Sequence, residues 1–323
     1  MGITLTHKVR LDPTHKQEEY FNKACGVARF TWNWALAEWD KQYRSGNKPT
    51  GLGLKKSFNA IKAAKYPWMY EVTKYAGQQP FIHLQRAFNS FFKKGSKYPR
   101  FKKKGRNDSF YIGNDHIKVE GRKIQIPKLG WVRMREDVRF SGKICAATIS
   151  RTADKWFASL NVELDERPRT CESQAGVGVD LGIRHLASLS NGERYEGPRP
   201  LKKRQRKLKR MQRQLSRKQK WSSNRNKARM KVAKIHYRIS CIRQDALHKL
   251  TTHLTGNFGS IAIEDLNVRG MMKNHTMARS IADMGFHEFR RQLSYKAEMR
   301  GNYVKIVWID GSRHQSVVVS AKV

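Results

Sequence analysis

Hydrophobic and polar positions repeat with two different periods along the early part of the chain, and each period predicts one type of element. Apolar residues at alternate positions, among them Ile3, Leu5 and Val9, predict a strand that leads into Asp12. Steps of three and four residues then mark one face of a long helix, at Phe21, Cys25, Ala28, Trp32, Ala35, Trp39 and Tyr43. Further helices are predicted around residues 54–64 and from Pro80 onward, since proline is tolerated in the first turn of a helix.

A period of two returns after this helical block and predicts a small β domain. Residues 117–126 are predicted to form a hairpin that turns at Glu120 and Gly121. Apolar and polar residues then alternate from Trp156 to Leu164, which is typical of a half-buried antiparallel strand. We therefore expect a β-barrel domain from residues 1–12 and 106–164, with a helical insertion at 13–105 and a linker at 165–174.

The pattern becomes α/β from Ala175 onward. Two short apolar strands are predicted to end on carboxylates, at Asp180 and Glu264. The segment between them, residues 199–244, contains no acidic residue and carries two helical stripes, which predict a basic helical insertion over 199–255. A helix near Phe286 and a strand over 303–309 complete an α/β domain at 175–310. The fold class is therefore α+β with several domains.

The net charge of the chain indicates a polyanionic partner. Its 323 residues include 66 Lys and Arg against 26 Asp and Glu, for a formal charge of +40, while 39% hydrophobic residues are enough for buried cores. Such an excess of one sign repels itself in a compact fold unless an anionic partner neutralises it. Nucleic acid is the natural candidate, and its binding should depend steeply on salt.

Several function classes are not supported by the sequence. The four cysteines are far apart and form no C-x-x-C pair, so we expect free thiols and no zinc site. No apolar run approaches the ~18 residues of a membrane-spanning helix. The chain also lacks a G-x-x-x-x-G-K-[ST] motif, so nucleotide hydrolysis by a P-loop is not predicted.

Asp180 and Glu264 are the candidate metal ligands. If their strands are neighbours in one sheet, the two carboxylates converge, and hard Mg²⁺ prefers such oxygen ligands. The alternative is that each carboxylate caps the turn that follows it. Two-metal chemistry on nucleic acids normally needs a third carboxylate. Asp283 and Asp310 are nearby acidic residues, but Asp283 follows Ser280 at a predicted helix start, where capping is the favoured role.

Two basic segments are candidate nucleic-acid contacts. Residues 93–104 interleave Tyr98 and Phe101 with lysines, as a stacking and phosphate-binding surface does, although Phe101 is equally compatible with a core anchor. Residues 199–244 have three interpretations: a solvated helix face, a nuclear-localisation type patch, or a nucleic-acid surface, which the single sign of charge favours. The predicted contacts are Lys97, Arg100, Phe101, Lys102, Lys103, Lys104, Lys202, Lys203, Arg204, Arg206, Lys207, Arg210, Arg213, Arg217, Lys218 and Arg243.

The motifs taken together resemble a known family. The sequence Gly-Val-Gly-Val-Asp-Leu-Gly at 176–182 is similar to a motif of the TnpB (OrfB) proteins of bacterial insertion sequences, which are compact relatives of the type V CRISPR nucleases. The resemblance runs from about residue 7 to about residue 307. It is carried further by Gly26–Leu36, Lys97–Lys104, Ile126–Trp131, Arg243–Leu250, Ile263–Asn267, Ser280–Phe289 and Leu293–Ala297.

This resemblance implies an RNA-guided DNA endonuclease. In such proteins a wedge barrel with a helical recognition insertion grips the guide RNA, and a RuvC domain with an RNase H-like fold cuts DNA with Mg²⁺ or Mn²⁺. Asp180 matches the first RuvC carboxylate of the family, and Glu264 matches the second. The implied partners are a guide RNA from the transposon end and target double-stranded DNA. The implied location is the cytoplasm of a bacterium or archaeon, in association with the nucleoid.

The C-terminal residues depart from the family pattern. TnpB proteins continue into a four-cysteine zinc ribbon and then a third carboxylate, whereas residues 311–323 match neither element. We therefore expect a C-terminally truncated copy without zinc, whose Mg²⁺-dependent cleavage is impaired. The alternative is a catalytically dead protein that binds nucleic acid, either RNA-guided or nonspecific.

Overall fold

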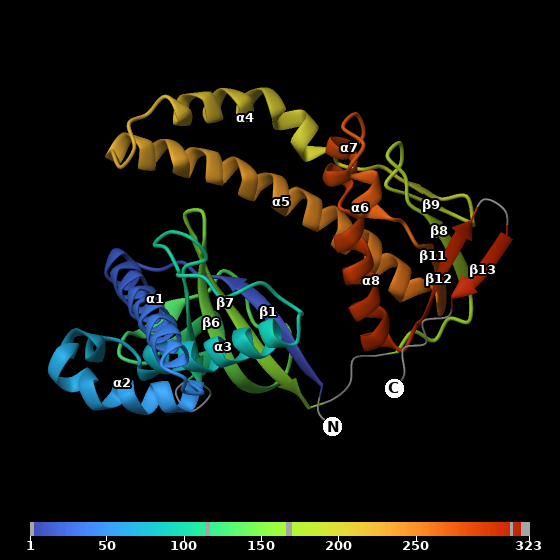
Figure 1. The fold of residues 1–323 in the computed structure, drawn as a ribbon. Helices are drawn as coiled ribbons and strands as arrows, with labels where there is room; N and C mark the ends of the chain where they lie inside the picture. The colour runs from blue at the N-terminus through green and yellow to red at the C-terminus, as the bar shows by residue number, and fades with distance from the viewer. Residues whose placement is uncertain (1–2, 114–116, 166–169, 311–312, 318–323) are drawn as a thin grey trace. The chain divides into compact units, whose positions relative to one another are not determined.

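The chain folds into two compact units, Met1–Asp165 and Glu166–Val323 (Figure 1). The computed structural model describes residues 3–113, 117–165, 170–310 and 313–317, with side chains as far as Val307. Each unit has a hydrophobic core of its own. The boundary falls directly after the strand that ends at Leu164.

The first unit is built on a four-stranded antiparallel sheet in the order β1-β7-β6-β2. Its strands are β1 (Thr4–Arg10), β2 (Ser109–Gly113), β6 (Gly142–Thr152) and β7 (Lys155–Leu164). A separate three-stranded sheet consists of β3 (Lys118–Glu120), β4 (Lys123–Ile126) and β5 (Gly130–Arg133). Val119 pairs with Ile124 across the turn at Gly121, which confirms the predicted hairpin.

The expected β-barrel is not formed. A closed barrel would require the edge strands β1 and β2 to pair with each other, but they remain the two edges of an open sheet. Helices pack against this sheet instead, and the rings of Tyr20 and Phe21 contact Phe110 on β2, with the Phe21 and Phe110 centroids 5.9 Å apart. Burial of these aromatic side chains stabilises the open arrangement.

Three α-helices and one 3-10 helix fill the segment between β1 and β2. They are α1 (His15–Arg44), α2 (Gly51–Lys65), η1 (Pro67–Glu71) and α3 (Lys74–Phe92). Thr14 and Gln17 form a reciprocal capping box, which fixes the start of α1. The apolar face of α1 is buried as far as Trp39, which stacks on Phe88 of α3 with ring centroids 4.0 Å apart, whereas Tyr43 is exposed.

Helix α3 begins earlier than the sequence suggests. Pro80 was expected in the first turn, but the helix starts at Lys74 and Pro80 lies inside it. The preceding turn is held by packing, because Ala76 is fully buried and a Cβ at Gly77 would lie 3.2 Å from the Met69 side chain. This close packing compensates for the hydrogen bond that a proline nitrogen cannot donate.

The second unit contains a six-stranded mixed sheet in the order β10-β9-β8-β11-β12-β13. The central strands β8, β11 and β12 are parallel, and the outer ones pair antiparallel. The bounds are β8 (Gly176–Asp180), β9 (Ala187–Leu189), β10 (Arg194–Tyr195), β11 (Ser260–Glu264), β12 (Tyr303–Asp310) and β13 (Arg313–Val317).

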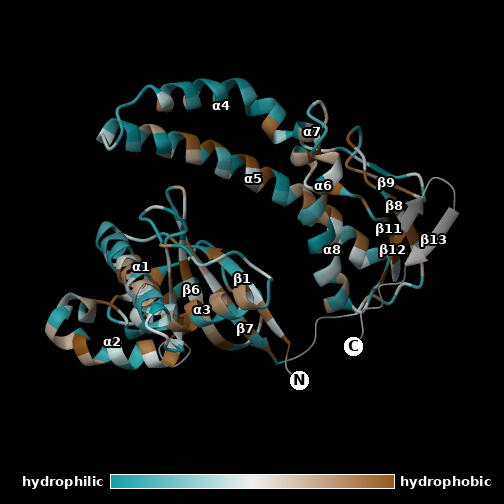
Figure 2. Cartoon of the chain, in the orientation of Figure 1, coloured by the Kyte–Doolittle hydropathy of each residue, from teal (hydrophilic) through white to brown (hydrophobic). Residues whose placement is uncertain are grey.

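Five helices accompany this sheet: α4 (Pro200–Ser216), α5 (Ser223–Asn257), α6 (Val268–Met271), α7 (Ala278–Met284) and α8 (Phe286–Arg300). Buried residues of α5 and α8, such as Leu254 and Phe289, share one core with Val179 and Ile263 of the sheet. Helix α4 and the adjoining part of α5 form a long hairpin, and α4 is mostly hydrophilic (Figures 1 and 2). Among the helices described here, none is long and apolar enough to cross a membrane.

Candidate metal centre and nucleic-acid interface

Asp180 and Glu264 lie at the carboxyl ends of neighbouring parallel strands. Val179 of β8 pairs with Ile263 of β11, so the two carboxylate residues occupy the next position in register. Val179 and Ile263 are buried on one face of the sheet, whereas Asp180 is exposed and Glu264 is half-buried. Successive side chains of a strand alternate between faces, so the two carboxylates share the opposite face.

The face that carries both carboxylates is open and lined by small residues. Gly178 and Ala262 precede the two carboxylates by two positions on this face, and both are only partly buried. Lys305 of β12 pairs with Ala262 and therefore lies on the same face. Neither Asp180 nor Glu264 makes an ion pair or side-chain hydrogen bond within the described part of the chain. Two carboxylates on neighbouring strands that have no partner of their own can share a bound cation.

Asp265, the neighbour of Glu264 in sequence, is engaged elsewhere. Its Oδ1 lies 2.6 Å from Nη1 of Arg290 on α8. The Asp265 backbone N–H donates to the Val307 carbonyl at 2.9 Å, which continues the pairing of β11 with β12. Asp265 therefore belongs to the contact between the sheet and α8, while Glu264 faces the other way.

Asp283 does not join the two carboxylates. It is 3% exposed, and its carboxylate accepts hydrogen bonds from the backbone N–H groups of Leu201 and Lys202 at 3.0–3.1 Å. These donors are at the start of α4, whose N-cap residue Arg199 supplies no side-chain cap of its own. The sequence suggested that Asp283 caps its own helix, but α7 begins at Ala278 and Asp283 caps α4 instead.

Arg243 completes this cluster and is only partly exposed. Its Nη2 lies 3.2 Å from Oδ1 of Asp283, and its Nε donates to the Asp283 carbonyl at 3.0 Å. The Arg243 side chain is 26% exposed. Its contact with nucleic acid stays a prediction, and the single sign of charge around Arg243 could not reveal that a carboxylate forty residues later pairs with it.

The donor set at the sheet edge fits one hard cation. Mg²⁺ is commonly held by one or two carboxylates, with water and substrate phosphates as its other ligands. Among the described residues no group of three or more His, Cys, Asp and Glu side chains is placed to hold a metal. The Asp310 side chain lies outside the described residues.

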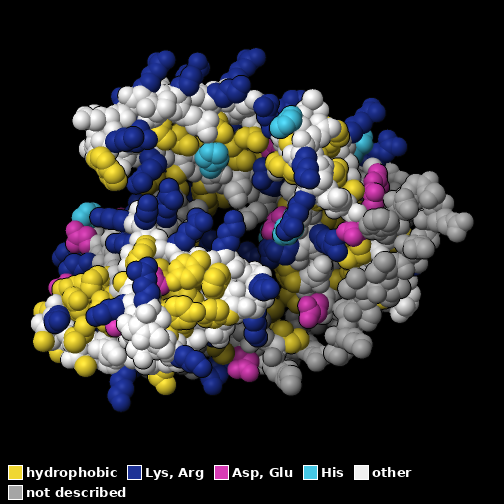
Figure 3. All heavy atoms as spheres, in the orientation of Figure 1, with side chains coloured by type: hydrophobic (Ala, Val, Ile, Leu, Met, Phe, Trp, Pro, Cys, Tyr) yellow, Lys and Arg dark blue, Asp and Glu magenta, His cyan; other side chains and the backbone are white. Residues whose placement is uncertain are grey.

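The α4–α5 hairpin presents a continuous basic surface. Leu208 of α4 is buried, whereas cations of this helix are exposed and project outward in Figure 3. Arg204 is half-buried. The other predicted contacts of this segment are exposed, namely Lys202, Lys203, Arg206, Lys207, Arg210, Arg213, Arg217 and Lys218.

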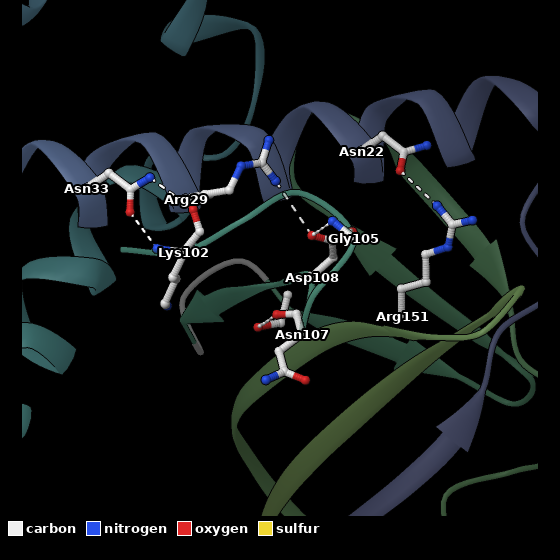
Figure 4. Close-up of polar contacts among 9 residues, drawn as sticks. Asn22, Arg29, Asn33, Lys102, Gly105, Asn107, Asp108 and Arg151 are labelled. Atoms are coloured by element: carbon white, nitrogen blue, oxygen red, sulfur yellow. Dashed lines mark hydrogen bonds and ion pairs between the residues drawn. The ribbon is translucent and has the colours of Figure 1, made fainter. Parts of the chain in front are cut away.

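The basic loop after α3 is fixed to α1 by its backbone. The Trp32 indole N–H donates to the Arg100 carbonyl at 3.0 Å. The Asn33 side chain accepts from the Lys102 N–H at 2.7 Å and donates to the Lys102 carbonyl at 3.0 Å (Figure 4). These contacts hold the backbone and leave the side chains of Lys97, Arg100, Lys103 and Lys104 exposed.

Two side chains of this loop differ in their surroundings. Phe101 is 55% exposed, which excludes the core-anchor alternative. The Lys102 ammonium lies 4.2 Å from the centroid of the Trp32 ring, and partial burial of this charge lowers the pKa of Lys102 although much of its side chain is exposed. Lys102 is thus partly engaged by α1, while Phe101 is available for stacking.

A polar cleft beside this loop contains residues that the sequence did not single out. It encloses about 510 Å³ and is lined by Asn22, Lys23, Cys25, Arg29, Lys104, Asp108 and Arg151. Arg29 pairs with Asp108 at 3.5 Å, and Arg151 donates to Asn22 at 3.4 Å (Figure 4). Four cations against one carboxylate leave the cleft positive. Because Arg151 and Arg29 are remote in sequence, only the fold reveals this grouping.

Comparisons with known proteins identify the family. The OrfB_IS605 family model, described as a probable transposase, matches residues 159–275, and a helix-turn-helix model of the same family matches residues 1–48. A putative RNA-guided DNA endonuclease, InsQ of Escherichia coli, is 36% identical over 318 residues, which span 93% of this chain and 79% of the relative. The chain belongs to the TnpB (OrfB) family. A putative RNA-guided DNA endonuclease of Streptomyces pristinaespiralis is 35% identical, with coverage of 95% of this chain and 78% of the relative.

The fold of this TnpB-family chain is also similar to a solved structure. The Cas12f1 chain of a Cas12f1-sgRNA-target DNA complex superposes with a TM-score of 0.53 at 12% identity, over 95% of this chain and 89% of that one. At this identity the likeness concerns the fold alone. Within the segment matched as helix-turn-helix, the described residues contain strand β1 and the single continuous helix α1 rather than two helices around a turn.

Proposed function

We propose that this TnpB-family chain is an RNA-guided DNA endonuclease whose metal site includes Asp180 and Glu264. The observation that carries the proposal is their register at the carboxyl ends of adjacent parallel strands, on one open face of the sheet. The formal charge of the chain, +40, also suits a nucleic-acid substrate. The two relatives described above are putative RNA-guided DNA endonucleases, which supports the same activity.

The two units have different roles in this proposal. Residues 1–12 and 106–164, as an open sheet rather than a barrel, and the helical residues 13–105 grip the guide RNA and read a short flanking DNA motif. Residues 175–310 form the RNase H-like cleavage domain. The guide RNA pairs with the target strand, so the protein supplies shape recognition and phosphate contacts rather than base-by-base readout.

The residues of the sheet edge have distinct tasks. Asp180 and Glu264 hold a divalent metal, which when bound stabilises charge on a phosphate and activates water. Lys305 on the same face attracts the phosphate backbone toward the two carboxylates. The exposed cations of the α4–α5 hairpin and of residues 93–104 neutralise further phosphates.

We expect cleavage by this chain to be slow. The two carboxylates found at this edge among the described residues hold one metal, whereas in-line displacement by two metals needs ligands that bridge and flank the pair. A nucleic-acid-binding protein that does not cleave is the second candidate function. It is favoured by the contrast between the extended basic surfaces and the small set of acidic ligands found among the described residues.

The test is programmed cleavage. The purified protein would be loaded with an RNA that matches a target DNA, or with the same RNA carrying a scrambled guide segment, and incubated with Mg²⁺. Cutting of the matched target only supports the proposal. Binding of matched and unmatched DNA to the same extent, without cutting, supports the second candidate. Cutting that ignores the RNA sequence contradicts RNA guidance.

A further inference from the structure

The turn between α4 and α5 presents an aromatic side chain to solvent. Trp221 is 95% exposed, more than any other large hydrophobic residue described, and it lies at the far end of the basic hairpin. Full exposure of an indole leaves a large apolar surface in water, at a cost that burial in either core would have avoided. A single exposed aromatic residue needs little explanation unless the surrounding structure holds it there.

The backbone holds Trp221 in a conformation that bulky residues rarely adopt. Its φ is 70°, in the left-handed region that favours glycine. The flanking turn is well defined, since both the N–H and the hydroxyl of Ser222 donate to the Gln219 carbonyl, at 3.3 and 2.9 Å. A side chain kept in a strained backbone conformation at a fixed turn is a recognised mark of a functional position.

A neighbouring arginine supports this turn from inside the hairpin. The Arg225 guanidinium donates to the carbonyls of Leu215 and Lys218, at 3.1 and 2.9 Å. Ser222 caps the start of α5 by accepting from the Arg225 N–H at 3.1 Å. The end of α4 and the start of α5 are thereby joined, so the indole is presented on a rigid support.

The surroundings of Trp221 select the kind of ligand. Arg217, Lys218 and Lys220 are exposed beside it, and residues 199–244 contain no acidic side chain. The other exposed neighbours, Gln219 and Ser223, are polar, so no apolar patch of the kind that a protein partner covers surrounds the indole. An aromatic face beside several cations matches a nucleobase with its phosphate, because the base stacks while the phosphates are neutralised.

We infer that Trp221 is a stacking site for an unpaired nucleobase of a nucleic-acid single strand. The inference rests on the proposed function for its choice of partner and adds a specific contact at the tip of the hairpin. The lysines and arginines beside it supply affinity that depends on salt, whereas stacking on the indole supplies affinity that does not.

Two substitutions separate stacking from folding. Trp221→Gly removes the ring and relieves the left-handed strain, so its melting temperature should equal or exceed that of the wild type. Trp221→Phe keeps an aromatic face. Affinity for short fluorescein-labelled single-stranded RNA or DNA should fall about 5- to 100-fold in Trp221→Gly and much less in Trp221→Phe, as measured by fluorescence anisotropy.

The salt dependence supplies the matched control. Trp221→Gly should leave the slope of log affinity against log salt unchanged, while Lys220→Ala should make the slope shallower because one phosphate contact is lost. Separate RNA and DNA strands show which one uses the site, and a strand that lacks all of its bases should bind equally to the wild type and Trp221→Gly.

The outcomes distinguish this inference from the proposed function. Wild-type protein that binds both kinds of strand, with an affinity unchanged in Trp221→Gly, overturns the stacking site and leaves the proposed function standing. If Trp221→Gly loses affinity equally for strands with and without bases, the stacking site is also overturned, because stacking requires a base. Wild-type protein that binds neither RNA nor DNA contradicts both.

Discussion

Asp283 and Asp180 both lie at the end of an element in the second unit, but their surroundings are opposite. Asp283 is 3% exposed, caps α4 and pairs with Arg243 at 3.2 Å. Asp180 is exposed beside Glu264, and neither has a side-chain partner within the described residues. A buried carboxylate surrounded by donors stabilises the fold, whereas two carboxylates without donors contribute little to its stability and are free to hold a cation. The contrast separates the acidic residues that maintain the structure from those available for chemistry.

The largest effect on stability should come from Asp283→Ala. It leaves the Arg243 charge and the first N–H groups of α4 without their acceptor, so we expect a loss of about 3 kcal/mol in the free energy of unfolding. Urea denaturation followed by circular dichroism measures it. Asp283→Asn is the matched control, because its amide oxygen still accepts from one N–H and should preserve part of the stability. If Asp283→Ala lost less unfolding free energy than a substitution at an exposed surface position, the capping role would be contradicted.

A smaller, pH-dependent effect should come from Glu288 on α8. Hydrogen bonds from Arg291, at 2.7 and 2.8 Å, lower the pKa of Glu288 to about 2. Because the folded pKa is depressed, this contribution to stability is complete above the ordinary glutamate pKa of about 4.5 and is lost as the pH falls toward about 2. Across this pH range the melting temperature of the wild type should decline more steeply than that of Glu288→Gln. If the melting temperatures of the two proteins declined in parallel, the result would argue against a stabilising Glu288–Arg291 pair.

The smallest effect should come from Asp265. Its partner Arg290 is 44% exposed and Asp265 is 37% exposed, and exposed pairs contribute at most about 1 kcal/mol. Asp265→Asn should therefore change the urea midpoint slightly and leave cleavage intact. If this variant abolished cleavage, Asp265 would have to be counted with Asp180 and Glu264 as a ligand.

Part of the fold and of the candidate site could be predicted from the sequence. Periodicity located α1, β7, β8 and β11, because each buries one face whose residues recur at a fixed spacing. It also placed Asp180 and Glu264 at strand ends. Their shared face follows only from the pairing of Val179 with Ile263, which depends on the register between strands far apart in the chain.

Tertiary contacts account for the features that the sequence did not predict. The sheet of the first unit stays open because α1 packs its aromatic residues against β2, and no local pattern reports that packing. Asp283 caps a helix that begins about eighty residues earlier, and Arg243 pairs with it, so neither role has a signature at short range. Local patterns predict elements, while partners distant in sequence decide the tasks of individual side chains.

Metal-dependent cleavage by the carboxylate variants tests the central claim most directly. Wild-type protein, Asp180→Ala, Glu264→Ala and Asp245→Asn, an exposed control on α5, would be loaded with one guide RNA and assayed with its target DNA over a range of Mg²⁺ concentrations. We predict that Asp180→Ala and Glu264→Ala reduce the cleavage rate at least about 100-fold, while melting temperature and DNA binding stay at wild-type values. Cleavage by both variants at the wild-type rate and with the wild-type dependence on Mg²⁺ would contradict the account.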